Sequence, residues 1–371
     1  MERKKRLLFV GQNLCVGGVQ TAFINHLKKM AKDPQYDITV YLFAKGKLFD
    51  QLPQNINIIE GNTMLQLISL PFDDVKKSKN IAKIILRAGA VVLAQLIGAE
   101  RVYRMCFKKL PSRYDMAASY FTDGLNGTFN RGTNLFVTEY VDADEKLTWI
   151  HTDPILADFD REYCRKLYKP FDKIVCVSNA VREKFNLFLP EYTDKTVTFH
   201  NVFDEQKTEN LSREFIPFEK SDFDIVTVAR EDNRSKRIDG IIRLCRKLKD
   251  EGISNFKWRV IGGGPSLEPN RELVKALAVE DVVLLEGEKS NPYPYIRTSD
   301  LFALYSAFEG FPMVIGETMI LNTPILTTNY AAAKEQIPSD KGRIASDDEE
   351  FYCILKDILV AKNAETSHAD R

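Results

Sequence analysis

The chain has 371 residues, 44% of them hydrophobic and 28% charged, which is ordinary for a globular protein and leaves little room for long disorder. Its length exceeds what one hydrophobic core usually serves, so two domains of roughly 150 to 200 residues are expected. The net charge is zero and no recognised reader motif accompanies the basic residues, so nucleic acid is not expected as a partner.

Positive charge is concentrated in the first part of the chain. Residues 1–110 contain 18 Lys and Arg against 8 Asp and Glu, and the rest of the chain carries the opposite excess. Such a field suits an anionic membrane surface or a phosphate-bearing acceptor. A solvated basic face without a partner explains the same residues equally well.

The N-terminus starts with basic residues, as a secretory signal does, but its apolar run ends after four residues, 7–10. We therefore expect a buried first strand, followed by a glycine-containing loop ahead of a helix, GQNLCVGGVQTAF (11–23). The six cysteines lie far apart and form no C-x-x-C pair. The expected location is the cytoplasm, with peripheral attachment to the inner face of the membrane as an open alternative.

A mostly apolar stretch, IILRAGAVVLAQLIGA, covers residues 84–99. Its uncharged portion, 88–99, is shorter than the roughly 20 apolar residues that cross a bilayer. It can lie in a membrane interface beside the basic face, or it can pack within the core.

Short apolar, β-branched runs alternate with helical patterns along the chain, at 7–11, 38–43, 173–178, 224–229, 258–263 and 300–306. That alternation is typical of βαβ units and predicts an α/β fold with parallel sheets. The series restarts near Asp224 after a polar stretch. We expect a first domain over 1–203, a linker over 204–222 and a second domain over 223–371, whose last helix is a candidate to pack back on the first domain.

The segment EGFPMVIGETMILNTPIL (309–326) carries the clearest chemical pattern. Glu309 and Glu317 are separated by seven residues, and a tight loop lies between the preceding strand and a helix. Free N–H groups at the start of that helix can receive a phosphate, while the carboxylates can accept hydrogen bonds from sugar and ribose hydroxyls. The loop and first helical turn comprise Pro312, Met313, Val314 and Ile315.

This segment resembles the E-x7-E signature of the retaining glycosyltransferases of family 4. Three more segments are similar to that family in the same order: the glycine loop 11–23, VAREDNRSKRIDG (228–240) and IGGGP (261–265). Each is weak alone, because glycine turns follow strands in any α/β protein, but four ordered matches rarely arise by chance. The resemblance, from residue 7 to the 330s, implies the GT-B architecture, in which two Rossmann-like domains with parallel sheets face a cleft.

The resemblance implies transfer of a sugar from a nucleotide-diphosphate donor, such as a UDP-sugar, to a glycan or lipid-linked acceptor, as in surface polysaccharide synthesis. Negative charge builds on the leaving oxygen, and we expect Arg230 and Lys236 to neutralise it without a metal. Glu309 is expected to bind the sugar and Glu317 the ribose. The donor-binding set also includes Gly17, Gly18, Gly263, Pro312, Met313, Val314 and Ile315.

Two residues of the first domain complete the candidate site. His151, in LTWIHTDP (147–154), matches a family stretch in which a histidine faces the donor sugar, and the alternative is a buried, hydrogen-bonded histidine. Asp123, in YFTDGLNGTF (120–129), is a candidate for binding the acceptor, although loop structure explains that segment equally well.

Neither a cofactor nor a metal is expected. Three D-x-D pairs exist, at 142/144, 158/160 and 222/224, and none stands clearly at the end of a strand where it could hold a divalent ion under a diphosphate. We interpret them as surface or capping groups. Open alternatives on the same fold are a nucleotide-sugar epimerase, a phosphorylase, and a noncatalytic subunit that binds a nucleotide sugar or a partner.

Overall fold

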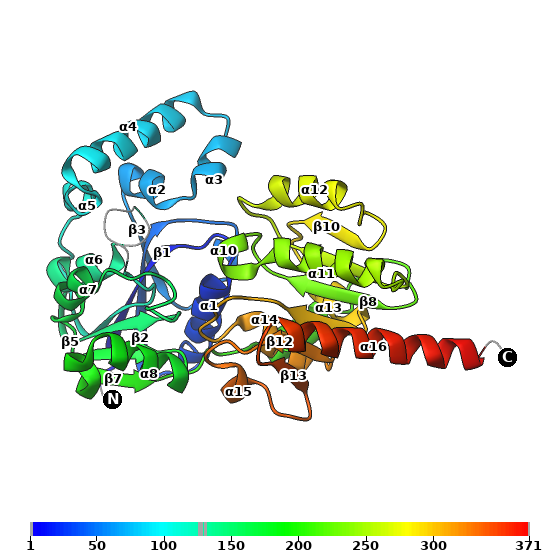
Figure 1. Ribbon diagram of the computed structural model, residues 1–371. Helices are drawn as coiled ribbons and strands as arrows, with labels where there is room; N and C mark the ends of the chain where they lie inside the picture. Colours follow the sequence, from blue (N-terminus) through cyan, green and yellow to red (C-terminus); the bar gives the residue numbers. More distant parts are fainter. Residues whose placement is uncertain (1–2, 125–128, 130–131, 370–371) are drawn as a thin grey trace. The chain divides into compact units, whose positions relative to one another are not determined.

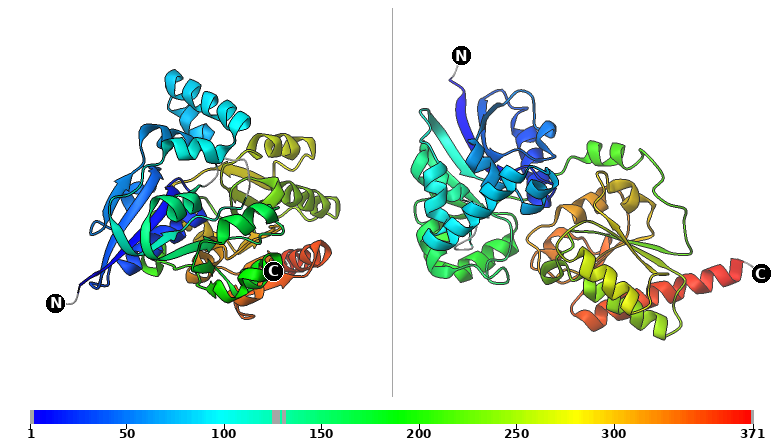
Figure 2. Two further views of the ribbon diagram at one scale, coloured as in Figure 1. Left: turned by 90° about the vertical axis from the view of Figure 1, so that its left-hand side faces the viewer. Right: turned by 90° about the horizontal axis from the view of Figure 1, so that it is seen from above.

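The computed structural model describes residues 3–124, 129 and 132–369. Contacts divide the chain into two compact units, residues 1–202 and 203–371. In each unit, helices cover both faces of a parallel sheet (Figure 1 and Figure 2). The prediction of an α/β protein with two Rossmann-like units is therefore confirmed.

The first unit is built on a seven-stranded parallel sheet with the order β3-β2-β1-β4-β5-β6-β7. Its strands are β1 (Lys5–Asn13), β2 (Tyr36–Ala44), β3 (Asn57–Glu60), β4 (Arg113–Ser119), β5 (Asp142–Ile150), β6 (Lys173–Cys176) and β7 (Thr196–Thr198). Its helices are α1 (Gly18–Met30), α2 (Thr63–Ser69), α3 (Phe72–Lys77), α4 (Ile81–Ile97), α5 (Ala99–Cys106), α6 (Thr133–Tyr140), α7 (Arg161–Tyr168) and α8 (Asn179–Phe188), with short 3-10 helices at Phe49–Gln51 and Pro190–Lys195. The apolar run 7–10 is fully buried in β1, as its sequence predicted.

The second unit has a six-stranded parallel sheet with the order β10-β9-β8-β11-β12-β13. Its strands are β8 (Asp224–Val228), β9 (Lys257–Ile261), β10 (Val283–Gly287), β11 (Leu301–Leu304), β12 (Ile325–Thr328) and β13 (Gly342–Ala345). Its helices are α9 (Glu205–Leu211), α10 (Asn233–Lys236), α11 (Ile238–Asp250), α12 (Leu267–Ala276), α13 (Tyr293–Thr298), α14 (Met313–Ile320), α15 (Ala333–Gln336) and α16 (Asp348–Ala369).

Each sheet reverses its direction of growth once. In the first unit the chain moves outward from β1 to β2 and β3, then returns to the other side of β1 as β4. In the second unit the reversal falls between β8 and β11. Ligands of open α/β sheets bind beside the carboxyl ends of the two strands at such a reversal, so these two places are where sites are expected.

The polar stretch 204–222, predicted to be a linker, instead belongs to the second unit and contains α9. Asp204 caps this helix by accepting a hydrogen bond from the Lys207 N–H (3.2 Å), and Thr208 is buried on its inner side. α9 packs against α13 and α14. Composition missed the helix because its buried face is short and polar.

The last helix, α16, uses its apolar residues within the second unit. Phe351, Leu355 and Leu359 recur every four residues and are buried in the core with Trp258 of β9. α16 contacts β12 and β13. This face of the helix therefore packs on the second sheet.

Helix α4 contains the apolar stretch that the sequence left open between core and membrane interface. Asn80 caps it by accepting a hydrogen bond from the Lys83 N–H (3.1 Å), and Gly98 ends it with a φ of 90°, which glycine adopts readily. Its inner face buries Arg87, Ala90 and Ala94. Its outer face leaves exposed Ile81, Ile85, Leu86, Val92 and Leu96.

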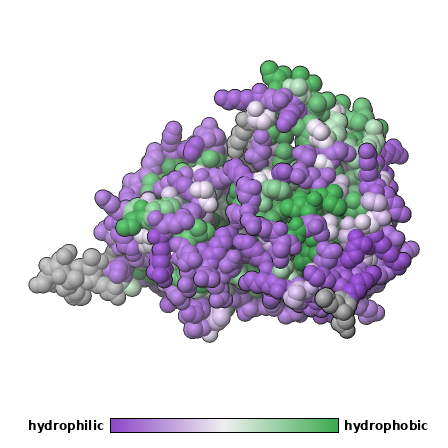
Figure 3. Space-filling view, turned by 180° about the vertical axis from the view of Figure 1, so that it is seen from behind, coloured by the Kyte–Doolittle hydropathy of each residue, from purple (hydrophilic) through white to green (hydrophobic). Residues whose placement is uncertain are grey.

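Figure 3 shows hydrophobic side chains gathered on the surface over this part of the first unit. None of the helices that the structure describes, α4 included, has the length and apolar character needed to cross a membrane. The outer face of α4 is therefore an exposed apolar stripe on a surface helix.

Candidate active site

Two loops meet at the carboxyl edge of the second sheet, where the sheet reverses. The loop after β8 leads into α10, and the loop after β11 leads into α14. The Ala307 N–H donates a hydrogen bond to the Ser235 carbonyl (2.8 Å), which ties the loops together. The predicted residues Arg230 and Glu309 lie on these loops, and Lys236 is the last residue of α10, so the structure brings the two motifs to one place.

Lys236 and Glu309 form an ion pair across these loops. The Lys236 ammonium contacts Glu309 Oε1, and the Ser306 hydroxyl donates to the same oxygen (2.8 Å). The side chains are only 22% and 11% exposed, so solvent screens the pair weakly. Glu309 Oε2 has no hydrogen-bond partner among the described residues and can accept from a ligand hydroxyl.

Arg230 follows β8 and is exposed. Within the described part of the chain its guanidinium forms no ion pair, whereas the nearby Arg237 is paired with Asp348 and stacks on Tyr305 (4.2 Å). A free guanidinium at the carboxyl end of a strand can neutralise an incoming diphosphate. The structure thus separates a structural arginine, Arg237, from one available to a ligand.

Helix α14 starts at the same edge with its amide groups uncapped by any side chain. Pro312 precedes its first residue, Met313, and no acidic residue lies in the first turn. Gln336 Nε2 donates to the Pro312 carbonyl (2.8 Å), which holds the turn from behind. The N–H groups of Met313, Val314 and Ile315 and the positive end of the helix dipole can bind a phosphate.

Glu317 lies one turn into α14 and is 8% exposed. The Tyr293 hydroxyl donates to its Oε1 (2.9 Å). Burial raises the pKa of Glu317 to about 7, although the Tyr293 hydrogen bond and the charge of Lys207 act in the opposite direction. Its Oε2 has no hydrogen-bond partner among the described residues. A carboxyl group with a pKa near 7 is partly ionised at neutral pH, and its ionised form can accept hydrogen bonds from ribose hydroxyls.

The glycine turn after β9, residues 262–264, packs on the loop after β8. A Cβ at Gly264 would lie 2.3 Å from the Glu231 carbonyl oxygen, and one at Gly262 would lie 1.8 Å from the Ala229 carbonyl oxygen. A Cβ at Gly263 would meet nothing closer than 3.5 Å. Close backbone packing therefore requires glycine at positions 262 and 264. It does not require glycine at position 263, the residue that was predicted to contact the donor.

Sequence reasoning missed the group that holds this turn in place. Glu231 is fully buried and accepts from Asn270 Nδ2 (2.9 Å), and burial raises the pKa of its carboxyl group. Its backbone N–H donates to the Gly263 carbonyl (3.0 Å). The signal was an acidic residue directly after Arg230 at a strand end. Tyr293, the partner of Glu317, had no comparable signal because it lies on another helix.

In the first unit, Gly17 and Gly18 lie where the glycine loop enters α1. Gly17 has extended dihedral angles (φ 172°) and precedes the first helical residue, Gly18. No side chain caps the helix, and its first turn holds no acidic residue. These glycines follow the carboxyl end of β1, at the reversal of the first sheet, where an anionic group can be bound.

His151 follows β5 and is half-buried. Its ring Nε2 lies 2.7 Å from the Tyr120 carbonyl oxygen, so this nitrogen carries a proton and donates. Its backbone N–H donates to Thr122 Oγ1 (2.8 Å), and its ring packs on that of Tyr120 (5.1 Å between centroids). The local contacts therefore hold the imidazole in one orientation at the carboxyl edge of the sheet.

Asp123 has a structural role that the sequence did not indicate. It is 3% exposed, and its two carboxylate oxygens accept from the N–H groups of Gly132 (3.1 Å) and Asn134 (3.0 Å) at the start of α6. Asp123 is thus a buried carboxylate bound to backbone amides, and its contact with the acceptor stays a prediction. Residues 125–128 of the proposed acceptor loop, 120–129, lie outside the described residues.

The D-x-D pairs have local partners. Asp144 pairs with Arg113, Asp160 caps α7 by accepting from the Tyr163 N–H (2.9 Å), and Asp224 pairs with Arg259 (3.4 Å). Among the described residues, no group of three or more His, Cys, Asp and Glu side chains could hold a metal ion. These contacts give Asp144, Asp160 and Asp224 structural roles.

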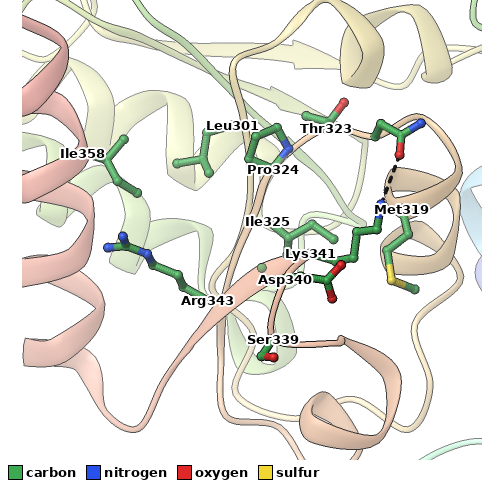
Figure 4. Close-up of a pocket in the computed structure, with 12 residues that line it drawn as sticks. Leu301, Met319, Thr323, Pro324, Ile325, Ser339, Asp340, Lys341, Arg343 and Ile358 are labelled. Atoms are coloured by element: carbon green, nitrogen blue, oxygen red, sulfur yellow. Dashed lines mark hydrogen bonds between the residues drawn. The ribbon is translucent and has the colours of Figure 1, made fainter.

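A pocket of about 400 Å³ lies at the opposite edge of the second sheet. Figure 4 shows its lining around the amino ends of β11, β12 and β13, with Leu301, Ile325 and Arg343 among the side chains. Parallel sheets bind ligands at their carboxyl edge, so this pocket is separate from the candidate site.

Residues 209–352 match the family model described as Glycosyl transferases group 1. An uncharacterized glycosyltransferase of Methanocaldococcus jannaschii is 24% identical over 205 residues, which are 52% of this chain and 50% of the relative. The Campylobacter jejuni enzyme N-acetylgalactosamine-N,N'-diacetylbacillosaminyl-diphospho-undecaprenol 4-alpha-N-acetylgalactosaminyltransferase is 30% identical over 116 residues, 31% of this chain and 30% of the relative. The chain thus matches at most half the length of these relatives.

The crystal structure of Anabaena Alr3699/HepE in complex with UDP and glucose is similar over nearly the whole chain. Its TM-score is 0.65 at 17% identity, and the match covers 98% of this chain and 91% of that one. At this identity the likeness shows the fold, which is GT-B, as the sequence resemblance implied.

Proposed function

We propose that the chain transfers a sugar from a nucleotide-diphosphate donor to a glycan or lipid-linked acceptor, as the match of residues 209–352 to the group 1 glycosyltransferases suggests. The observation that carries the proposal is the set of groups at the reversal of the second sheet. Arg230, the Lys236–Glu309 pair and the uncapped start of α14 lie on loops at one edge. Cations, helix amides and carboxylates are the groups that a sugar diphosphate needs.

In this proposal each group acts on one part of the donor. Arg230, Lys236 and the α14 amides bind the diphosphate and stabilise its charge as the bond to the sugar breaks. Glu309 positions the sugar through its open Oε2, and Glu317 accepts hydrogen bonds from the ribose hydroxyls. Lys236 already contacts Glu309, so its ammonium group would bind a diphosphate oxygen and the Glu309 carboxylate together.

We further propose retention at the anomeric carbon, without a metal. None of the proposed site residues is an obvious covalent nucleophile for the donor sugar. The acceptor oxygen would bond to the anomeric carbon on the face that the diphosphate leaves, and the acceptor proton would pass to the departing phosphate oxygen. His151, Gly17 and Gly18 would contribute from the first unit, His151 at the sugar and the glycine amides at the phosphates.

A panel of nucleotide sugars tests this function. The matching donor should raise the unfolding temperature of the full chain, since a ligand at 100 times its dissociation constant adds about 2.7 kcal/mol. Product analysis with that donor then separates transfer from epimerisation, which needs no acceptor, and from phosphorolysis, which needs free phosphate. Donor binding without any turnover would instead favour the noncatalytic alternative.

The acceptor is proposed to be membrane-associated, with α4 resting on an anionic lipid surface from the cytoplasmic side. The exposed stripe of Ile81, Ile85, Val92 and Leu96 is apolar, and the exposed Lys83 is beside it. The C. jejuni relative, by its name, acts on a diphospho-undecaprenol.

Vesicle binding tests the membrane proposal. The full chain should sediment with anionic vesicles, less so at high salt, and Leu96→Asp should abolish this. Val360→Asp, at an exposed apolar position of α16 in the second unit, is the matched control. Equal sedimentation of the two variants would contradict a role for α4.

A further inference from the structure

Arg87 is an unusual residue on the inner face of α4. It is only 9% exposed, and its guanidinium lies over the ring of Phe129, 4.9 Å from the centroid. Nε and Nη1 are enclosed and have no hydrogen-bond partner among residues 3–124, 129 and 132–369. Within the described part of the chain, no carboxylate pairs with Arg87. Among the described residues of the first unit, Arg87 is therefore a buried positive charge without a paired carboxylate.

Other polar groups gather beside this guanidinium. The Tyr103 hydroxyl donates to the Phe129 carbonyl (2.5 Å), and Gln12 Nε2 donates to the same oxygen (2.7 Å). Burial raises the pKa of Tyr103, while Ser69, Gln12 and Arg87 all act on it in the opposite direction, so the four groups are neighbours. The Ser69 hydroxyl is itself buried beside Tyr103, and no group of the described residues meets hydrogen-bond geometry with it.

This cluster lies near the reversal of the first sheet. Gln12 is the second-last residue of β1, and Asp123 follows β4, the strand on the other side of the reversal. The carboxylate of Asp123 is already bound to the amides of α6, and Glu100 is paired with Arg104. Asp123 and Glu100 thus have other partners, and the arrangement favours a ligand that brings its own negative charge.

We propose that Arg87 binds an oxyanion, a phosphate or carboxylate carried by the acceptor, with the Ser69 hydroxyl as a second donor. A buried guanidinium is costly unless it is paired and hydrogen-bonded, and its planar fork suits two oxygens of one anion. A neutral sugar would leave the charge unpaired. Only the identity of the anion as part of the acceptor rests on the proposed glycosyltransferase function.

Anion titration of the full chain tests the site without requiring catalysis. The probes are inorganic phosphate and hexyl phosphate, measured by calorimetry and by unfolding temperature. We expect wild type and Arg101→Gln, which removes an exposed arginine of α5, to bind alike. Arg87→Gln should weaken binding by at least about 30-fold, as expected for loss of one partner of a buried charged pair. Arg87→Lys should be intermediate, because it keeps the charge but not the fork.

The unfolding temperature without any anion separates a ligand-binding arginine from a packing one. Removing an unpaired buried charge should leave the unfolding temperature of Arg87→Gln equal to that of wild type or higher. A marked fall, or failure to fold, would show that the stacking on Phe129 is structural and would overturn the proposal. Unchanged phosphate affinity in Arg87→Gln would overturn it equally.

The two probes identify the source of the anion. Tighter binding of hexyl phosphate than of inorganic phosphate would indicate a lipid phosphate, and equal binding would indicate a phosphate on a soluble acceptor. Once an acceptor is known, Arg87→Gln should raise its KM and leave donor affinity unchanged. Absence of any transfer would refute the proposed function and leave the phosphate result standing.

Discussion

Replacing Glu317 by glutamine should make the second unit less sensitive to pH. In the folded chain burial raises the pKa of Glu317 from 4.5 to about 7. Between these values the native state holds a proton that the unfolded state has lost, so stability falls as pH rises through this window. At 1.36 kcal/mol per unit, the loss by pH 8 is about 3 kcal/mol relative to pH 4. The amide of Glu317→Gln cannot ionise and should not show this loss.

The chain offers a selective reporter for this measurement. Its two tryptophans, Trp149 and Trp258, lie in different units, and both are buried. In a Trp149→Phe background, fluorescence follows only Trp258 of the second unit during denaturant unfolding. Curves from pH 4 to pH 8.5, with and without Glu317→Gln, give the difference in stability directly. The same slope in both proteins would refute the buried, proton-holding state of Glu317.

The proton on Glu317 should also weaken ligand binding, so affinity should rise with pH where stability falls. Ribose hydroxyls donate to the ionised carboxylate, so the affinity of wild type for nucleoside diphosphate should fall about tenfold per pH unit below pH 7. The ligand's own titration is common to both proteins, and Glu317→Gln isolates the protein's contribution. At pH 8 this variant should bind more weakly by about 1 to 3 kcal/mol. Equal affinity at all pH values would remove Glu317 from the ribose site.

Three further outcomes are expected. Glu309→Gln should leave affinity for the nucleoside diphosphate nearly unchanged, because that ligand lacks the transferred sugar. Its turnover should fall by about 10- to 100-fold, because the donor sugar is no longer positioned. Equal losses of diphosphate affinity in Glu309→Gln and Glu317→Gln would contradict this division of roles. Excess EDTA should leave the rate unchanged, and complete loss restored by manganese would refute the metal-free mechanism. Gly264→Ala should destabilise the chain by about 1 to 3 kcal/mol, because its Cβ would clash with the Glu231 carbonyl. Gly263→Ala should keep the wild-type unfolding temperature but bind the donor less well. Equal unfolding temperatures of the two variants would contradict the packing argument.

Local sequence signals predicted much of the second unit's site. The strand ending at Leu304, the tight loop after it and the start of α14 follow from apolar runs and from breakers such as Pro312, and these act within a few residues. The same reasoning missed α9, because helix formation there depends on packing against α13 and α14, which are distant in sequence. It also did not show that Asp123 is buried and bound to backbone amides, since composition does not report burial.

The sequence by itself determined six of the strands, the α/β class and the motif that places Glu309 and Glu317 eight positions apart. Propensity, periodicity and turn chemistry are properties of neighbouring residues. Only the tertiary structure decided what surrounds those groups. The pairing of Lys236 with Glu309 spans 73 positions, and the hydrogen bond from Tyr293 to Glu317 spans 24. Protonation, charge pairing and burial arise from contacts between distant segments, so the raised pKa of Glu317 and the unpaired charge of Arg87 become visible only after the chain has folded.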